Sequence, residues 1–278
     1  MGFRYHGGVA HRSPFALVAA VSALLLASAG VNRHSLEGAM ACAGARASPS
    51  GDSGRVAAAR LRLKDSLPAL FVAQNVSWPP RALFLRAIKE QDDGKPGVLE
   101  MWAQGKNQRA YTLIKSYPIC ALSGTLGPKR REGDMQIPEG FYTISRLNPQ
   151  SNYHLSMRVD YPNASDRARA RALDSKASLG GDIMVHGHCV TIGCIPIENE
   201  PIEEVYLAAS AVFAHGPVSI HIFPRRLDAA GLASLLLTTS DEGLRGFWRE
   251  LAAGYQGFEK TQQPPTITTA PDGAYQVN

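Results

Sequence analysis

Short segments in which apolar and polar positions partly alternate recur between residues 82 and 224, and turns rich in glycine and proline separate them. A period of two residues predicts β-strands, in which successive side chains point to opposite faces. The predicted strands are Leu83–Lys89, Val98–Ala103, Ala110–Tyr117, Gly140–Ser145, Ile183–His186 and Val218–Phe223. This pattern favours short antiparallel strands in a sandwich or small barrel over a parallel array with alternating helices.

Helical spacing of apolar residues appears on both sides of this strand-rich region. Residues 54–74 predict a lead-in helix that Pro68 interrupts, because proline lacks the N–H that a helix interior needs. Residues 200–214 predict a second helix, for which Asn199 is the expected N-cap.

After Pro224 the strand pattern stops and two amphipathic helices are predicted, over residues 228–237 and 241–258. Thr239 and Glu242 have the spacing of a capping box for the second of these helices. The final segment, residues 261–278, is rich in proline, threonine and glutamine and is expected to be a loosely attached tail.

The amino terminus has the layout of a secretory signal. Arg4 and Arg12 precede an apolar run that ends in an Ala-Ser-Ala tripeptide at residues 27–29. The run is shorter than the roughly 20 apolar residues of a membrane span. Residues 1–29 are therefore predicted to be a signal peptide, with an uncleaved signal anchor as the alternative and as the only expected membrane contact.

The composition describes an ordinary globular protein of 278 residues, of which 45% are hydrophobic and 19% charged. The net charge of +5 suits a protein that works near an anionic polymer, such as a cell envelope. The basic residues are scattered and lack interleaved aromatic residues, so nucleic acid is not an expected partner.

Two histidines and two cysteines fall within nine residues, in the segment His186-Gly-His-Cys-Val-Thr-Ile-Gly-Cys194 that follows a predicted strand. Gly193 allows a tight turn before Cys194, and their backbone amides would be free to face an oxyanion. A cysteine attacks carbonyl carbons as a thiolate, and His186 could accept its proton. The segment therefore contains the groups that acyl transfer requires.

A zinc site is the alternative interpretation, since histidine and cysteine are both zinc ligands. Adjacent residues such as His188 and Cys189 point to opposite sides of an extended segment, which disfavours one shared ion. We therefore expect His188 and Cys189 to take no part in the chemistry. The chain has four cysteines, and whether Cys120 and Cys189 form a disulfide is left open.

At these residues the chain resembles the YkuD-type L,D-transpeptidases, in the compressed form of the YafK-like branch. Further segments that carry the resemblance are Ser116–Lys129, Gly133–Tyr142, Leu147–Ser156 and Tyr161–Asn163. The resemblance implies an exported bacterial enzyme, in the periplasm or cell envelope, that acts on peptidoglycan stem peptides and needs no cofactor. Its cysteine would attack an L,D peptide bond, form a thioester, and pass the acyl group to an amine or to water.

The resemblance also implies a fold and a division of the chain. We expect an α+β protein with a mostly antiparallel catalytic domain and with peripheral and C-terminal helices. The expected divisions are a signal peptide at 1–29, a linker and lead-in helix at 30–81, the catalytic domain at 82–224, C-terminal helices at 225–260 and a tail at 261–278.

Position by position, the resemblance makes Cys194 the nucleophile, His186 the proton donor and acceptor, and Gly193 the oxyanion amide. Thr191 matches the hydroxyl residue of the motif and is a candidate substrate contact.

Three further residues, Tyr153, His154 and Lys129, are candidate substrate contacts. Tyr153 and His154 lie in a segment that resembles the family, and Lys129 is basic enough to meet an acidic stem peptide. No metal ligand is assigned.

The chain departs from the wider family pattern in three places. The spacing from His186 to Cys194 is short, Ile192 stands where many members have histidine, and Pro196 replaces an arginine. Because that arginine is missing, recognition of a substrate carboxylate stays open, and so does the choice between transfer and thiol-dependent hydrolysis that releases a wall-attached protein or peptide. A zinc-stabilised module without catalysis is the third alternative, from the histidine and cysteine cluster itself.

Overall fold

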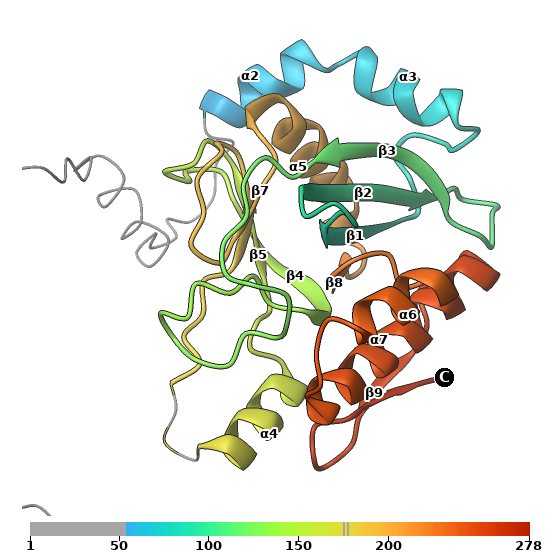
Figure 1. Ribbon diagram of the computed structural model, residues 1–278. Helices are drawn as coiled ribbons and strands as arrows, with labels where there is room; N and C mark the ends of the chain where they lie inside the picture. Colours follow the sequence, from blue (N-terminus) through green and yellow to red (C-terminus); the bar gives the residue numbers. More distant parts are fainter. Residues whose placement is uncertain (1–53, 175, 177) are drawn as a thin grey trace, which may run out of the picture.

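The computed structural model describes residues 54–174, 176 and 178–278 (Figure 1). The predicted signal peptide, most of the predicted linker and Cys42 lie outside the described residues. Within the described part of the chain, no helix combines the length and the apolar character that crossing a bilayer requires.

An eight-stranded mixed sheet forms the centre of the fold, in the order β3-β2-β1-β8-β4-β5-β6-β7. Its strands are β1 (Ala82–Glu90), β2 (Pro96–Gln104), β3 (Thr112–Pro118), β4 (Gly140–Asn148), β5 (Ser156–Val159), β6 (Met184–His186), β7 (Ile195–Pro196) and β8 (Ser219–Phe223). Only the pairs β1–β8 and β6–β7 are parallel, and the other neighbours are antiparallel. The chain is therefore an α+β protein with a mostly antiparallel sheet, as predicted.

Strand β4 joins two parts of the sheet. Residues Gly140–Thr143 pair with β8, and the second half of the strand pairs with β5 after a register shift near Ile144. Strands β5, β6 and β7 therefore extend the sheet on one side of β4, and the histidine–cysteine segment lies there. The sequence pattern missed β5 and β7, because four and two residues are too few to show alternation.

Six helices are described: α2 (Gly54–Arg62), α3 (Ser66–Ala73), α4 (Ala164–Leu173), α5 (Asn199–Phe213), α6 (Ala229–Leu236) and α7 (Glu242–Thr261). In Figure 1, α2 and α3 lie above the sheet with α5, while α6 and α7 lie below it. Apolar side chains of β1 such as Leu85 share a core with α2, α3 and α5. Phe84 faces the other way and contacts Phe258 of α7, with ring centroids 4.8 Å apart. Helices thus bury both faces of β1, which accounts for its nearly continuous apolar sequence.

Two predicted helix caps are wrong. The residue before α5 is Glu198 at a φ of +66°, and Asn199 instead accepts a hydrogen bond from the backbone N–H of His188 at 3.1 Å. The N-cap of α7 is Asp241, which accepts from the N–H of Leu244, so the predicted capping box does not form.

The predicted break at Pro68 is also misplaced. The first helix ends before residues 63–65, and Pro68 lies in the first turn of α3. Proline is tolerated there because the first N–H groups of a helix have no partner within the helix.

The carboxyl-terminal segment is not a loose tail. It forms a hairpin of β9 (Ile267–Thr269) and β10 (Tyr275–Val277), and Tyr275 is only 6% exposed. The Tyr275 hydroxyl accepts a hydrogen bond from Asn163 at 2.9 Å, and its ring meets Phe141 at 4.8 Å. One buried aromatic residue anchors this segment, and average composition does not reveal such an anchor.

Helix α7 packs so closely on Phe141 that Gly254 has no room for a side chain. A Cβ atom at Gly254 would lie 2.5 Å from the Phe141 ring, whereas one at Gly257 would meet nothing within 4 Å. We expect Gly254→Ala to lower the free energy of unfolding by about 1–3 kcal/mol through overpacking. Gly257→Ala, in the same helix, should raise it by up to about 1 kcal/mol. Urea denaturation measures both, and a stabilised Gly254→Ala variant would contradict this packing.

Candidate active site

The parallel pairing of β6 with β7 brings the two ends of the histidine–cysteine segment together. Val185 pairs with Ile195 and His186 with Pro196, so Cys194 is the residue just before this short ladder. Cys194 itself lies outside β7, directly before its first residue. The pairing therefore brings His186 opposite Pro196, two residues after Cys194. The residues 187–193 form the loop between His186 and Cys194.

His186 is fully buried and its ring is oriented by the backbone. Its Nδ1 atom lies 2.5 Å from the carbonyl oxygen of Gly187, which can only accept, so Nδ1 carries the proton. The other ring nitrogen, Nε2, is buried and has no hydrogen-bond partner among the described residues. His186 therefore presents a lone pair on Nε2 that can accept a proton from a thiol.

The surroundings of His186 keep the imidazole neutral. Burial lowers its pKa to about 4, although the hydrogen bond to Gly187 partly opposes this shift. The ring of Tyr153 lies against the imidazole, with centroids 4.8 Å apart. A neutral imidazole at ordinary pH is the form that acts as a general base.

Cys194 is 1% exposed and keeps its thiol, which contacts the backbone carbonyl of Asp182 with an Sγ–O distance of 3.8 Å. Gly193, directly before it, has a φ of +135°, which disfavours other residues. A Cβ atom at Gly193 would also lie 3.1 Å from the carbonyl oxygen of Gln136. Glycine is thus required here by both backbone conformation and space.

The hydroxyl of Thr191 accepts hydrogen bonds from both backbone N–H groups that are candidates for binding an oxyanion. The N–H groups of Gly193 and Cys194 both donate to Thr191 Oγ1, at 3.1 and 2.8 Å, and this hydroxyl donates to the carbonyl of Cys194 at 2.7 Å. The expectation that these amides are free is therefore wrong for this conformation. Thr191 holds the turn, and an oxyanion could use the same donors only if the hydroxyl moved away.

Tyr153, His154 and Lys129, three of the predicted substrate contacts, lie in different surroundings in the structure. Tyr153 lies beside His186, whereas the ring of His154 turns to Glu203 on α5, with an Nε2–Oε1 distance of 2.6 Å. Lys129 is 4% exposed, and its ammonium donates to Asp134 at 2.6 Å and to the carbonyl of Arg131 at 3.0 Å. Lys129 is therefore buried and paired within its own loop, which argues against the predicted substrate contact.

A disulfide fixes the 187–193 loop to the end of β3. It joins Cys120 and Cys189, with Cα atoms 5.3 Å apart, and the N–H of Cys120 also donates to the carbonyl of Pro196 at 3.0 Å. The disulfide argues against the zinc interpretation, since it takes the sulfur of Cys189 from the four ligands considered. Among the described residues, Cys120, Cys189 and Glu198 are the only set close enough to share an ion, and two of them are bonded to each other.

Two groups that contact the site residues are backbone carbonyls, which a sequence pattern does not reveal. The acceptor that orients His186 is the backbone carbonyl of Gly187, and the group beside the Cys194 thiol is the carbonyl of Asp182. Only the disulfide could have been suspected, from the presence of Cys120 and Cys189 in a chain with a signal-like amino terminus.

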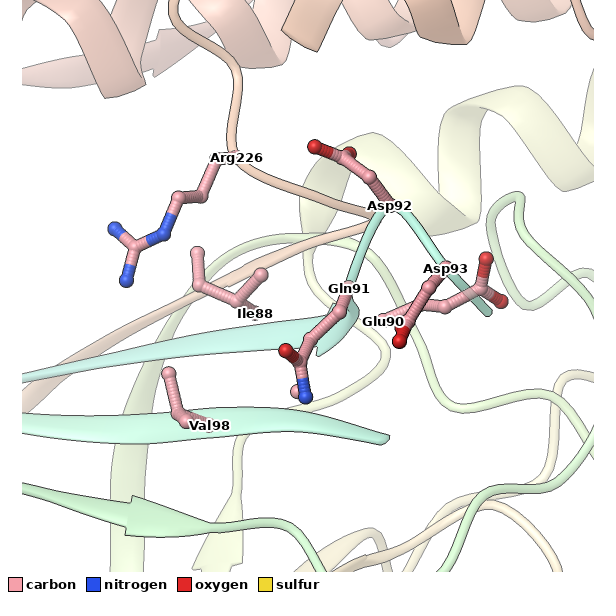
Figure 2. A pocket seen from close by; sticks show the side chains of 8 residues that line it. Ile88, Glu90, Gln91, Asp92, Asp93, Val98 and Arg226 are labelled. Carbon is pink, nitrogen blue, oxygen red and sulfur yellow. The ribbon is translucent and has the colours of Figure 1, made fainter. Parts of the chain in front are cut away.

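A second cleft lies at the turn between β1 and β2, where Glu90, Asp92 and Asp93 gather (Figure 2). In the sheet order, β8, β4 and β5 separate β1 from β6. Glu90 is paired with Arg225, and Asp93 with Lys95. Because Glu90 and Asp93 are already paired with cations, we assign no chemistry to this cleft.

The site thus combines a buried thiol with a neutral imidazole at the end of a neighbouring strand in an α+β sheet. The YkuD family model, described as the L,D-transpeptidase catalytic domain, matches residues 97–219. The "Putative L,D-transpeptidase YafK" of Escherichia coli K12 is 34% identical over 204 residues, which cover 69% of this chain and 78% of the relative. The chain belongs to the YkuD family of L,D-transpeptidase domains.

The chain also has similarity to solved structures that are more distant in sequence. Pgp2 of Campylobacter jejuni, described as a helical cell shape determining protein, is 16% identical, with a TM-score of 0.39 over 68% of this chain and 73% of that one. Bd1075 of Bdellovibrio bacteriovorus is 15% identical, with a TM-score of 0.35 over 69% and 78% of the two chains.

The lowered pKa of His186 predicts an unusual acid limit for the reaction. A base must be unprotonated, so kcat/KM should fall only as the pH drops through about 4, and not near the ordinary histidine value of about 6.5. A pH profile with a peptide substrate measures this limit.

The pH profile needs a folding control. The unfolded chain binds the His186 proton near pH 6.5, so this group's contribution to stability is lost as the pH falls from about 6.5 to about 4. Circular dichroism at each pH shows whether the protein stays folded. An acid limit near 6.5 in folded protein would contradict the assignment of His186.

Proposed function

We propose that this protein is an exported cysteine acyl-transferase that acts on L,D peptide bonds of peptidoglycan stem peptides through a thioester. The observation that carries the proposal is His186 Nε2, which is buried without a hydrogen-bond partner among the described residues, in a strand whose parallel partner β7 begins directly after Cys194. Family membership supports the reaction class, and the net charge of +5 suits an anionic wall polymer.

The proposed first step forms the thioester. The Cys194 sulfur attacks the carbonyl carbon while its proton passes to His186 Nε2, and the Gly187 carbonyl stabilises the resulting imidazolium through Nδ1. When the tetrahedral intermediate collapses, the C–N bond breaks and the amine leaves with the proton from Nε2. The acyl group stays on sulfur.

The proposed second step regenerates the thiol. An amine attacks the thioester carbonyl and gives a proton to His186. The C–S bond then breaks to give a new amide, and His186 returns the proton to the sulfur of Cys194. Water in place of the amine gives a free acid instead. In both steps the amides of Gly193 and Cys194 would hold the oxyanion after Thr191 Oγ1 rotates away from them.

Export is part of the proposal. A disulfide between Cys120 and Cys189 is typical of proteins that fold in an oxidising compartment, and the predicted signal at residues 1–29 agrees with this. Fractionation of cells that produce the full chain tests this part, and a soluble cytoplasmic pool with reduced Cys120 and Cys189 would contradict it.

Product analysis tests the reaction. Purified protein is incubated with a muropeptide that carries an L,D bond, with and without an acceptor amine, and the products are separated by mass. We expect an amide that contains the added amine, and Cys194→Ala should yield none. If the free acid is the only product at saturating amine, the protein is a hydrolase that releases a protein or peptide from the wall.

A further inference from the structure

We propose that α2 and α5 together position the imidazole of His186 through the β4–β5 loop (residues 149–155). The positioning residues are Arg55 of α2, His154 of the loop and Glu203 of α5. The inference rests on the proposed function, in which His186 is the base. It goes beyond that function because α2 lies outside residues 97–219, the segment that matches the catalytic domain.

The β4–β5 loop contacts His186 directly and also through the residue that follows it. The ring of Tyr153 lies 4.8 Å from the imidazole, centroid to centroid. The N–H of Gly187 donates to the carbonyls of Tyr153 and Leu155, at 3.1 and 3.2 Å. The carbonyl of the same Gly187 accepts the Nδ1–H of His186. A shift of the loop would therefore move both the ring beside the imidazole and the acceptor that orients it.

The loop packs against Gly187 without leaving space between them. A Cβ atom at Gly187 would lie 3.0 Å from the carbonyl oxygen of Tyr153 and 3.1 Å from the Cβ atom of His154. It would also lie 2.5 Å from Asn199 Oδ1 on α5. Because protein interiors are close-packed, a displacement of the loop is passed on to Gly187.

Arg55 links the loop to α2. Its Nη1 atom donates to the backbone carbonyls of Ser151 and His154, at 2.6 and 2.8 Å. Hydrogen bonds from a charged donor are stronger than those between neutral groups. His154 also has a φ of +69°, which is uncommon for a residue with a side chain and persists only where surrounding contacts hold it. Arg55 makes one of those contacts at His154 itself.

Glu203 on α5 holds the side chain of the same loop residue. Its carboxylate oxygen lies 2.6 Å from His154 Nε2, and the carboxylate also pairs with Arg62 of α2. Burial, together with the nearby charge of Arg55, lowers the pKa of His154, so the ring is neutral and donates from Nε2 to the carboxylate. Glu203 is only 7% exposed, and its two partners tie the loop to both helices.

The cover that the loop provides affects the titration of His186. Burial is the largest cause of its low pKa, and the hydrogen bond to Gly187 acts in the opposite direction. The titratable groups on the segments packed against the imidazole are Tyr153, His188 and Cys194, and the charge of His188 also lowers its pKa. Because burial is the larger effect, a loosened loop that admits water should raise the pKa of His186 from about 4 toward about 6.5.

NMR of the full chain with isotope-labelled histidine measures the pKa of His186 without any need for turnover. The signal is assigned by its absence from His186→Gln. We expect Glu203→Gln and Arg55→Gln each to raise this pKa toward the ordinary histidine value. In steady-state kinetics both variants should lower kcat by roughly 10- to 100-fold and leave KM nearly unchanged, because they displace the base and not the substrate.

Glu204→Gln is the matched control for Glu203→Gln. Glu204 is the next residue of α5, and its carboxylate pairs with Lys115 and accepts from the Tyr117 hydroxyl, both on β3. This variant should leave the pKa of His186 and kcat unchanged. Arg55→Lys keeps a cation that can donate to the loop carbonyls, so it should retain most of the activity that Arg55→Gln loses.

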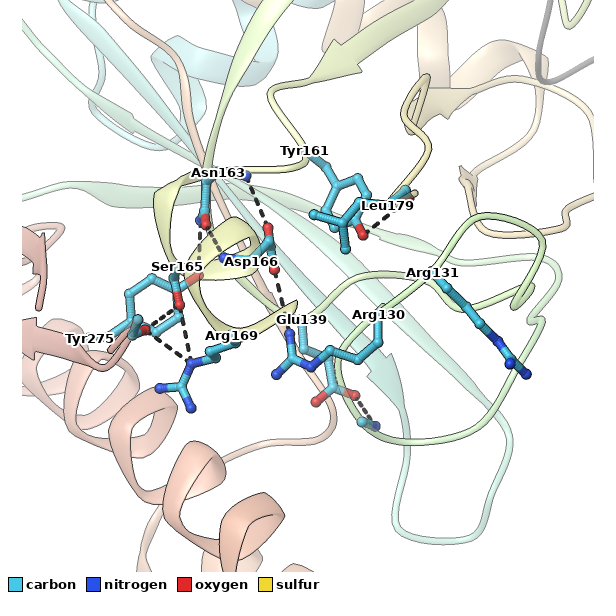
Figure 3. Close-up of polar contacts among 12 residues, drawn as sticks. Arg130, Arg131, Glu139, Tyr161, Asn163, Ser165, Asp166, Arg169, Leu179 and Tyr275 are labelled. Atoms are coloured by element: carbon cyan, nitrogen blue, oxygen red, sulfur yellow. Dashed lines mark hydrogen bonds and ion pairs between the residues drawn. The ribbon is translucent and has the colours of Figure 1, made fainter. Parts of the chain in front are cut away.

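Asp166→Asn separates positioning from stability. Asp166 is a second buried carboxylate, which accepts hydrogen bonds from Tyr142 and from the N–H of Asn163 and is ion-paired with Arg130 (Figure 3). Breaking such a buried pair is destabilising, so the urea midpoint should fall. The pKa of His186 should nevertheless keep its wild-type value.

An unchanged pKa of His186 in both Glu203→Gln and Arg55→Gln would overturn the inference, and so would an equal rise in Glu204→Gln or Asp166→Asn. Failure of the proposed function would look different. The pKa of His186 would then still rise in the two positioning variants, but the wild-type protein would never become acylated at Cys194.

Discussion

Replacing Cys194 with alanine is expected to abolish turnover of an L,D peptide, with a loss in kcat of at least roughly 10³-fold. His186→Gln should cause a loss of similar size, because the two side chains act as one unit in every proton transfer. For the same reason, the loss in kcat of the Cys194→Ala/His186→Gln double variant should be no larger than the loss in either single variant. Steady-state kinetics with a defined muropeptide measures the three losses.

His188→Gln is the matched control for these variants. His188 is exposed, lies two residues from His186 in the same loop, and contributes its backbone N–H and not its side chain to Asn199. It should keep nearly full activity. Because His186 is completely buried, thermal unfolding must accompany the assays. If folded His186→Gln kept most of the wild-type activity, the assignment of the base would be wrong.

Removing the Cys120–Cys189 disulfide is expected to have the second largest effect. The bond closes a loop with a sequence separation of 69 residues, and such a bond typically contributes about 2–4 kcal/mol to stability. It also ties the 187–193 loop to the end of β3, so kcat should fall in the Cys120→Ser/Cys189→Ser variant, while the chemistry still depends on Cys194. Urea denaturation and single-turnover kinetics measure the two effects.

The Cys194→Ser variant is the control for stability, since it keeps the disulfide. A reducing agent should destabilise Cys194→Ser and leave Cys120→Ser/Cys189→Ser unchanged. If the reducing agent changed the urea midpoint of neither variant, the disulfide would contribute nothing to stability. The inference that it holds the 187–193 loop in place would then be wrong.

The sequence predicted the strands that bury one or both faces, because their periodicity repeats over several residues. It could not predict β7, which has two residues and exists only because it pairs with β6. It also misjudged the carboxyl-terminal hairpin, which is anchored by the buried ring of Tyr275 and by hydrogen bonds from Ser165 and Arg169 to Gly273.

The histidine and cysteine of the candidate site could be named from the sequence because imidazole and thiol are reactive side-chain groups. The contacts made around them could not be predicted. The carbonyl of Gly187, the hydroxyl of Thr191 against two amides, and the paired ammonium of Lys129 depend on contacts formed only in the folded chain. Lys129 is the clearest case, since a charged loop residue is usually exposed, and here Asp134 compensates its burial.

Intact-mass spectrometry of the protein mixed rapidly with a stem tetrapeptide tests the central claim most directly. We predict a covalent adduct that equals the mass of the peptide less its leaving amino acid, located by digestion on Cys194 and absent from Cys194→Ala. Product formation without any adduct on Cys194, or an adduct that persists in Cys194→Ala, would contradict the thioester mechanism.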